Sequence, residues 1–274
     1  MAGKQVAVIV GAGPGLGQAL AKRYGQAGWR VCIGDLSVER CEETMQQLDA
    51  LGVTAHALEC DVTREPDLER AARWLDEHWG GADMIINNAG VAQVGPLKDV
   101  TLKDWRWIIE INMLGVVRGC KVFIPRFEEQ GHGAILNIAS MAGLTHMPES
   151  ASYNATKAAV VAISETLELE LDKNIQVSVA CPAFFRTNLT DTLRATDARG
   201  VKMVNKLVGH ARVGADEIAD KIFQGVEQGD FHILTHPDSE KVWWLKRLLP
   251  HKLYLKALET LKTRAAKQRA KRKS

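Results

Sequence analysis

The sequence predicts an α/β fold in three layers, with a doubly wound, mainly seven-stranded parallel sheet between two layers of helices. Short apolar runs of strand length alternate with segments of helical periodicity from residue 5 to residue 235. A glycine cluster closes the first apolar run, and polar residues follow several of the later ones. Alternation at this spacing joins parallel strands through right-handed crossovers, and ligands bind such sheets where the strands end.

The elements are predicted in chain order from these two periodicities. Residues 5–10 form an apolar run that the glycine turn closes, and residues 16–27 then carry helical periodicity. The further predicted strands cover residues 30–34, 54–59, 83–86, 134–138, 175–180 and 231–235. The further predicted helices cover residues 38–51, 65–79, 102–129, 151–171 and 215–228.

The bulk composition is that of a globular protein with one large core. The chain has 274 residues, of which 46% are hydrophobic and 25% are charged. It contains no apolar run of about 18 residues, and its amino terminus lacks the features of a signal peptide, so we expect a cytoplasmic protein. The five cysteines are scattered and never spaced as Cys-x-x-Cys, which indicates neither a disulfide framework nor a zinc site, and no metal is expected.

We expect a dinucleotide-binding domain of residues 1–238 and a helical, basic extension of residues 239–274. The formal net charge of +2 hides an asymmetry, because residues 262–274 carry seven Lys or Arg residues and no acid. Adjacent tryptophans, an apolar stripe and this basic end let the extension pack on the domain or on a sister subunit. The same features suit an anionic membrane surface, with peripheral contact through residues 240–274. No nucleic-acid binding is expected, because no recognition module accompanies the basic run.

The glycine cluster after the first strand indicates a site for a pyrophosphate. Gly11, Gly15 and Gly17 have the spacing Gly-x-x-x-Gly-x-Gly, with Gly13 between them. Such a turn needs unusual backbone angles, and a pyrophosphate needs close approach to bare amide groups. A purely structural glycine turn is the alternative.

Asp35 ends the second predicted strand, eighteen residues after Gly17. A carboxylate there can accept hydrogen bonds from both hydroxyls of an adenosine ribose. The 2′-phosphate of NADP would be repelled by Asp35, and the neighbouring positions that could compensate hold Leu36 and Pro14. The sequence therefore favours NAD over NADP. The alternative for Asp35 is a helix cap, a role that Ser37 could also fill.

Two further strand ends carry small polar residues. Asp61 and Val62 follow the third strand, and Asn88, Ala89 and Gly90 follow the fourth. Such residues suit the adenine edge and the floor of a ligand crevice, although plain turn chemistry would also explain them.

Tyr153, Lys157 and Ser140 form the candidate catalytic group. Tyr153 and Lys157 are four residues apart on one predicted helix and share a face, and Ser140 follows a strand thirteen residues before Tyr153. A phenol of pKa about 10 is barely ionised at neutral pH, so a catalytic tyrosine needs a nearby positive charge, which Lys157 can supply. Ser140 would hold the substrate oxygen while Tyr153 exchanges its proton.

With these motifs in place, the chain resembles the short-chain dehydrogenase/reductase superfamily in its compact single-domain branch, over residues 5–235. The resemblance implies a Rossmann fold, an NAD(H) cofactor and a homodimer or homotetramer. It adds Asn112, which would hold a water relay to Lys157, to the catalytic set. The implied cofactor-binding residues are Gly11, Gly13, Gly15, Leu16, Gly17, Asp35, Leu36, Asp61, Val62, Asn88, Ala89, Gly90, Tyr153, Lys157, Pro182, Phe185 and Thr187.

Three positions depart from the commonest pattern of that superfamily. Val10 stands where a threonine is common, Ala139 where a second serine is usual, and Ala183 where a glycine is usual. None of them removes a reacting group. Ala183 puts the conformation of its loop in doubt, because glycine adopts backbone angles that alanine avoids.

The apolar segment of residues 184–212 resembles the superfamily's mobile substrate lid, with core packing as the alternative. The candidate substrate-binding residues are Leu144, Met147, Phe184 and Leu189. They predict an apolar alcohol, above all a secondary one, or its ketone or aldehyde as the substrate. A rival hypothesis is a non-catalytic dinucleotide-binding regulator or scaffold that docks through its basic tail.

Overall fold

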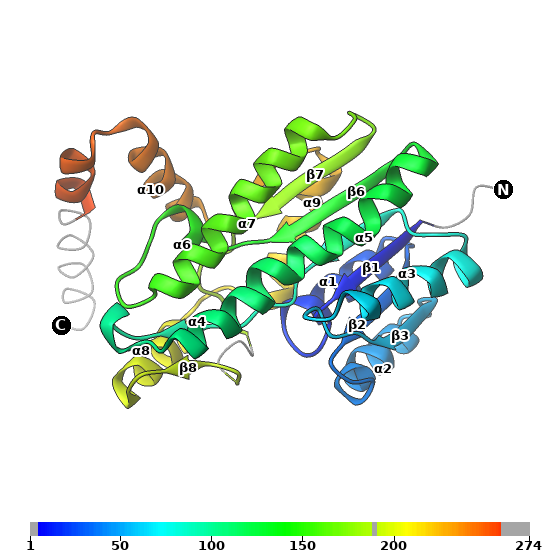
Figure 1. Ribbon diagram of the computed structural model, residues 1–274, viewed down its shortest axis with the longest axis horizontal. Coiled ribbons are helices and arrows are strands. Elements are labelled where there is room, and N and C mark those ends of the chain that lie inside the picture. The colour runs from blue at the N-terminus through cyan, green and yellow to red at the C-terminus, as the bar shows by residue number, and fades with distance from the viewer. Residues whose placement is uncertain (1–4, 188–190, 259–274) are drawn as a thin grey trace. The chain divides into compact units, whose positions relative to one another are not determined.

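A computed structural model describes residues 5–187 and 191–258 of the chain (Figure 1). It divides into two compact units that meet between Thr235 and His236, and each unit is described by itself.

The first unit is built on a seven-stranded sheet in which every pairing is parallel, as the sequence predicts. The strand order is β3-β2-β1-β4-β6-β7-β9. The strands are β1 (Val6–Val10), β2 (Arg30–Asp35), β3 (Ala55–Glu59), β4 (Met84–Asn87), β6 (Gly133–Ile138), β7 (Ile175–Ala180) and β9 (His232–Ile233). The order reverses between β1 and β4, so the ends of these strands flank the crevice in which such sheets bind ligands.

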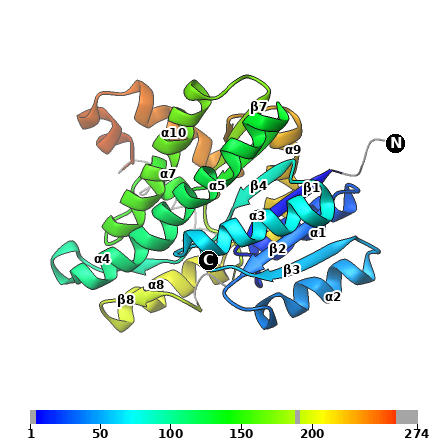
Figure 2. The same ribbon diagram turned by 45° about the vertical axis from the view of Figure 1, so that its right-hand side comes forward.

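Helices cover the sheet in two groups (Figures 1 and 2). In the first group, α1 contacts both α2 and α9. In the second group, α3 contacts α5, and α4 contacts α7. The helices are α1 (Leu16–Gln26), α2 (Glu42–Ala50), α9 (Ala215–Glu227), α3 (Glu65–Trp79), α4 (Leu102–Ile109), α5 (Gly115–Gln130) and α7 (Ala151–Glu170). The three-layer, doubly wound arrangement that the sequence predicts is confirmed.

The core of this unit lies against both faces of the sheet. All five residues of β1 are buried, which fits a strand that is covered by helices on either side. Tyr24 of α1 packs edge-on against Trp29 and Phe223, and this aromatic cluster joins α1 to α9. The five cysteines are all buried free thiols.

Several elements differ from the sequence-based expectation. The predicted helix 102–129 is interrupted by a π-helical turn over Glu110–Leu114, which separates α4 from α5. Two short strands, β5 (Gln93–Val94) and β8 (Arg194–Ala195), form a second parallel sheet that the sequence analysis does not contain. The helices α6 (Met141–Leu144) and α8 (Ala198–Gly209) are also additional.

The second unit is helical where it is described. It contains α10 (Pro237–Leu248) and a further helix over residues 251–258. Within α10, the Arg247 guanidinium lies 4.8 Å from the centre of the Trp243 ring. None of the helices described in either unit is long and apolar enough to cross a membrane.

Candidate active site

The glycine turn between β1 and α1 is packed against the loop that follows β4. A Cβ on Gly11, whose φ is +82°, would lie 2.5 Å from the Ala89 Cα, and a Cβ on Gly17 would lie 2.2 Å from the Gly11 carbonyl oxygen. The Asn88 amide donates a hydrogen bond of 2.5 Å to that same oxygen. Close packing within the protein alone therefore requires glycine at positions 11 and 17. It also brings the two predicted motifs together at the crevice.

Asp35 lies beside this turn as a buried carboxylate with three hydrogen-bond donors. Its Oδ2 accepts the Gly13 amide at 2.8 Å, and its Oδ1 accepts the Leu36 amide at 2.9 Å. The third donor is Arg40 Nε, at 2.5 Å from Oδ1. Arg40 lies in the 3-10 turn Glu39–Cys41 that follows β2. The sequence pointed only to Leu36 and Pro14 as neighbours of Asp35, and the structure adds the basic side chain of Arg40.

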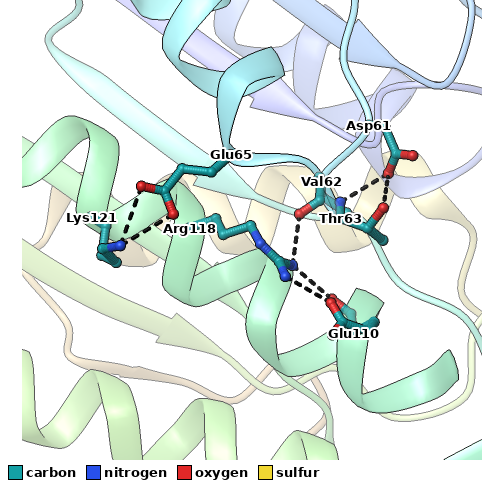
Figure 3. A network of polar contacts seen from close by, with 7 residues as sticks. All are labelled: Asp61, Val62, Thr63, Glu65, Glu110, Arg118 and Lys121. Atoms are coloured by element: carbon teal, nitrogen blue, oxygen red, sulfur yellow. Dashed lines mark hydrogen bonds and ion pairs between the residues drawn. The ribbon is translucent and has the colours of Figure 1, made fainter. Parts of the chain in front are cut away.

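The loop after β3 is fixed by side chains from three elements (Figure 3). Asp61 Oδ1 accepts hydrogen bonds from the backbone amide and the hydroxyl of Thr63, both at 2.8 Å. Arg118 of α5 donates to the Val62 carbonyl oxygen at 3.2 Å and pairs with Glu110 of the π-helical turn at 2.7 Å. The predicted adenine-binding residues Asp61 and Val62 are thus held in a defined loop that is tied to α5.

Asn112 lies in the π-helical turn and is fully buried. Its side chain accepts the Val91 amide at 2.8 Å and donates to the Val91 carbonyl oxygen at 2.9 Å. A Cβ on Gly90 would lie 3.5 Å from both Asn112 Oδ1 and Lys157 Nζ. The asparagine therefore holds the chain directly after Asn88-Ala89-Gly90 and places it next to Lys157, while a water relay through Asn112 stays a prediction.

Tyr153 and Lys157 lie one turn apart on α7, where Tyr153 is half-buried and Lys157 is buried. Lys157 is 4% exposed and donates a hydrogen bond of 2.8 Å to the carbonyl oxygen of Ile138, where β6 ends. Burial lowers the pKa of the Lys157 ammonium to about 8. The Tyr153 phenol shares a hydrogen bond with Ser140, which lowers its pKa, but burial outweighs that bond and raises the pKa overall.

This balance differs from the expectation that Lys157 makes the phenol acidic. Loss of water around the phenol raises the pKa of Tyr153 and is the larger effect, and the hydrogen bond with Ser140 lowers it. Ser140 contacts Tyr153, and Lys157 lies one turn further along α7, out of bulk solvent.

The loop that carries Ser140 is braced against α7. Ser140 caps α6 by accepting the Ala142 amide at 3.1 Å. A Cβ on Gly143 would lie 2.6 Å from the Lys157 backbone carbonyl, so α6 and α7 are in close backbone contact. Asn154, the neighbour of Tyr153, donates to the Met147 carbonyl oxygen at 2.8 Å. These contacts fix Ser140 and the candidate substrate residue Met147 relative to the phenol.

The segment after β7 joins the Ser140 loop to the glycine turn. The Pro182 carbonyl oxygen accepts the Met141 amide at 3.0 Å and the Ser140 hydroxyl at 3.4 Å. Thr187 lines a cavity of about 470 Å³ together with Pro14, Gly15 and the end of α8. Leu16, the first residue of α1, is buried beside this turn.

The predicted substrate residues differ in how far they are buried. Leu144 is buried in α6, Phe184 is partly exposed, and Leu189 lies outside the described residues. Phe185 belongs to the core cluster that includes α1 and α9, so its side chain serves core packing. The alternative of core packing thus applies to Phe185 and to the buried Val204 of α8, whereas Met203 and Leu207 are 38% and 39% exposed.

The segment predicted as a lid contacts β5 and α4 through β8. β8 pairs with β5, and Arg194 of β8 forms an ion pair of 2.9 Å with Asp104 of α4. Its guanidinium lies 3.8 Å from the centre of the Trp107 ring. Gly95 has a φ of +151°, and a Cβ there would lie 2.3 Å from the Thr196 hydroxyl. The structure therefore holds residues 194–196 against β5 and α4.

Among the described residues there is no group of three or more His, Cys, Asp or Glu side chains that could hold a metal ion.

Comparisons with known proteins agree with this geometry. Residues 5–198 match the model of the short chain dehydrogenase family. A dehydrogenase/reductase of CLA biosynthesis from Lactiplantibacillus plantarum is 32% identical over 254 residues, which are 85% of this chain and 88% of that protein.

Two solved structures carry nicotinamide dinucleotides. A short chain dehydrogenase/reductase from Burkholderia phymatum in complex with NAD is 30% identical, with a TM-score of 0.84 and coverage of 89% of this chain and 93% of that one. A short-chain dehydrogenase from Sphingobium yanoikuyae in complex with NADPH is 27% identical, with a TM-score of 0.72 and coverage of 96% and 95%.

Proposed function

The chain belongs to the short chain dehydrogenase family, whose members are oxidoreductases that bind a nicotinamide dinucleotide, and from this premise we propose that it interconverts an apolar alcohol and its ketone or aldehyde with NAD(H). A secondary alcohol and its ketone are the favoured pair. The observation that carries the proposal is that Tyr153 shares a hydrogen bond with Ser140, while Lys157, one turn along α7, is buried with its ammonium beside Gly90. A protein that only binds a dinucleotide would not need a tyrosine that is bonded to Ser140.

The residues around the glycine turn fit a dinucleotide. The bare backbone of Gly13 and Gly15 faces the start of α1, where no side chain of the described residues caps the helix, so its amide groups and its dipole can hold a pyrophosphate. The adjoining cavity is lined by Lys22 and Arg186, which add positive charge, and by Thr187, which would bond the nicotinamide amide group. Asp35 and the loop of Asp61 and Val62 would hold the adenosine.

The bound dinucleotide would supply the hydride in reduction and accept it in oxidation. When a hydride adds to the carbonyl carbon, the substrate oxygen becomes alkoxide-like, and Tyr153 gives it the phenolic proton while Ser140 donates a hydrogen bond. The ammonium of Lys157 stabilises the tyrosinate that remains until it takes a proton from solvent. In oxidation the tyrosinate takes the hydroxyl proton instead.

We propose NAD(H) as the preferred cofactor because the Asp35 carboxylate lies at the end of β2, where an adenosine 2′-phosphate would meet its negative charge. Similar proteins have been solved with NAD and with NADPH, so relatives of both kinds exist. The oligomeric state, the membrane contact of residues 240–274 and the water relay through Asn112 stay predictions.

The proposal is tested with the purified chain, a panel of apolar secondary alcohols and ketones, and the nicotinamide absorbance as the readout. We expect Tyr153→Phe to keep NADH affinity and to lose turnover by about 100-fold or more. The matched control is Tyr24→Phe, because the Tyr24 hydroxyl is buried without a hydrogen-bond partner in the part of the chain described. Full turnover in Tyr153→Phe would refute the mechanism, and NADH binding without any turnover across the panel would favour the rival, a non-catalytic dinucleotide-binding regulator.

A further inference from the structure

We propose that the second unit, residues 236–274, docks this chain on an anionic phospholipid surface, with the exposed faces of its two described helices against the lipid. The inference does not depend on the proposed chemistry, because it uses residues of the second unit alone.

The first argument is that α10 has an exposed face that carries large apolar side chains. The half-buried residues of its central part lie on one side of the helix and are Val242, Trp243, Leu245 and Lys246. On the opposite side, Trp244 and Leu248 are four residues apart and therefore adjacent, with exposures of 47% and 73%. Packing within the chain therefore does not explain why these two positions are apolar.

The helix over residues 251–258 repeats this pattern. Tyr254 is buried and Ala257 and Leu258 are half-buried, which is one face at the spacing i, i+3, i+4. The opposite face is exposed and holds two leucines and two lysines, namely Leu253, Leu255, Lys252 and Lys256. Such a mixture lets leucines enter the boundary of the acyl chains while the lysines meet the headgroups.

The second argument is charge. Residues 241–274 carry twelve Lys or Arg residues and one acid, Glu259, which gives this segment a net charge of +11. The whole chain has a formal net charge of +2, so residues 1–240 carry −9. An anionic bilayer repels a body of that sign and attracts the extension, so the charge separation also orients the chain on the surface.

Aromatic rings and a cation lie side by side in α10. The ring centres of Trp243 and Trp244 are 5.0 Å apart, and the Arg247 guanidinium lies 4.8 Å from the centre of the Trp243 ring. Tryptophan is enriched where protein meets the headgroup layer, because one part of its side chain is apolar and the other donates a hydrogen bond. None of the described helices can cross a bilayer, so the contact is with its surface.

Two other occupants fit this face less well. In a two-fold dimer the same patch meets itself, so a second copy would bring two segments of net charge +11 together. A nucleic acid would neutralise the cations but would leave Leu248 and Leu255 in water. An anionic bilayer receives both the leucines and the cations.

The test is co-sedimentation of the full chain with vesicles of phosphatidylcholine alone or with about 30% phosphatidylserine. We expect binding to be about tenfold or more stronger on the anionic vesicles, and this preference should fall as NaCl rises from about 0.05 to 0.5 M. The double variant Trp244→Ser/Leu248→Ser should weaken binding by about tenfold or more, because it removes apolar surface that enters the interface. Lys252→Glu/Lys256→Glu should weaken binding to the anionic vesicles by a similar factor.

The matched controls are Leu169→Ser and Lys173→Glu, which change an apolar and a basic residue on the surface of the first unit. Leu169 is 87% exposed in α7, and Lys173 is exposed just after that helix. Each control should bind vesicles within about twofold of the unchanged chain. Circular dichroism verifies that every variant is folded.

Equal binding to both kinds of vesicle, or binding to neither, would overturn the inference. So would an oligomer that dissociates in Trp244→Ser/Leu248→Ser without vesicles, since sedimentation velocity would then assign the face to a second copy. Duplex DNA that binds more tightly than the anionic vesicles, and is weakened by the lysine changes alone, would assign the face to a nucleic acid instead. None of these results bears on turnover, which tests the proposed function separately.

Discussion

The ammonium of Lys157 donates a hydrogen bond of 2.8 Å to the carbonyl oxygen of Ile138, so α7 is tied to the end of β6 through a buried charge. Lys157 is 4% exposed, and its Nζ lies 3.5 Å from the point that a Cβ on Gly90 would occupy. Burying this charge destabilises the folded chain, since one hydrogen bond does not replace the water that a free ammonium binds. The lowered pKa of about 8 expresses that destabilisation.

Lys157→Met should therefore abolish turnover and yet stabilise the fold. At pH 7 we expect the free energy of unfolding to rise by about 1–3 kcal/mol, because the cost of burying the charge disappears and one hydrogen bond is lost with it. The folded-state pKa of about 8 lies below the ordinary value of 10.5, so the unfolded chain binds the proton more tightly. The unchanged chain should gain stability as the pH rises from 8 to 10.5, and the advantage of the variant should shrink over that window.

Urea unfolding at pH 7, 8, 9 and 10 measures this effect. The control is Lys121→Met, whose side chain is 60% exposed and pairs with Glu65, and which should change stability by less than about 0.5 kcal/mol at every pH. An advantage of Lys157→Met that did not vary with pH would contradict the argument.

Asn112→Ala should weaken cofactor binding through the backbone. The substitution leaves the amide and the carbonyl of Val91 without their side-chain partner, so we expect a loss of about 1–3 kcal/mol in the free energy of unfolding and weaker NADH binding. Thermal unfolding with and without NADH separates the two effects. Wild-type NADH affinity in this variant would show that Gly90 is positioned by other contacts.

Gly95→Ala should detach the lid segment from β5. The added methyl group would meet the Thr196 side chain at a φ of +151°, so both the backbone and the β5–β8 pairing would be strained. We expect hydrogen exchange to accelerate at the Arg194 and Thr196 amides, which bond the Ala92 and Val94 carbonyl oxygens.

The control for this variant is Gly131→Ala. Gly131 has a φ of +74° at the end of α5, and a Cβ there would meet nothing within 4 Å. Gly131→Ala therefore introduces backbone strain but no steric clash. If exchange at residues 194 and 196 accelerated in both variants, the clash with Thr196 would not be the cause.

Arg194→Ala should raise KM for the substrate more than it lowers kcat. The side chain contributes an ion pair with Asp104 and a contact with the Trp107 ring, which together hold β8 against α4 by a modest free energy. A KM increase of about 3- to 10-fold is expected. Hydrogen bonds from Thr101 and Arg194 hold the pKa of Asp104 below its usual range, so the increase should persist from neutral to mildly acidic pH. Arg199→Ala removes an exposed arginine of α8 whose ion pair, within the described residues, is with Asp197, and steady-state kinetics should show no change for it.

The sheet and the catalytic residues could be predicted because their signals are local. Apolar runs mark β1 to β4, and the spacing of Tyr153 and Lys157 places both on one helical face whatever the tertiary structure. β5 and β8 have two residues each, which is too short for any periodicity, and their pairing joins segments about a hundred residues apart. The π-helical turn at Glu110–Leu114 was missed because it keeps the apolar pattern of the surrounding helix.

The contact of Arg40 with Asp35 and the pKa of Tyr153 could not be predicted from the sequence, for a different reason. The contact of Arg40 with Asp35 depends on a short 3-10 turn, although an arginine five residues after a strand-end acid is a signal worth checking. The electrostatics of Tyr153 depend on how completely its surroundings exclude water, and no spacing in the sequence reports that.

The five buried thiols make local unfolding of the chain measurable by chemical modification. Burial raises the pKa of Cys60, Cys120 and Cys181 to about 12 and that of Cys41 to about 11, and it raises the pKa of Cys32 as well. Alkylating reagents attack thiolates, so the native molecule offers them almost nothing to react with at neutral pH. A thiol can be alkylated only after local unfolding exposes it. The alkylation rate of each cysteine, measured by mass spectrometry of its peptide, would therefore report the rate of local unfolding around that cysteine.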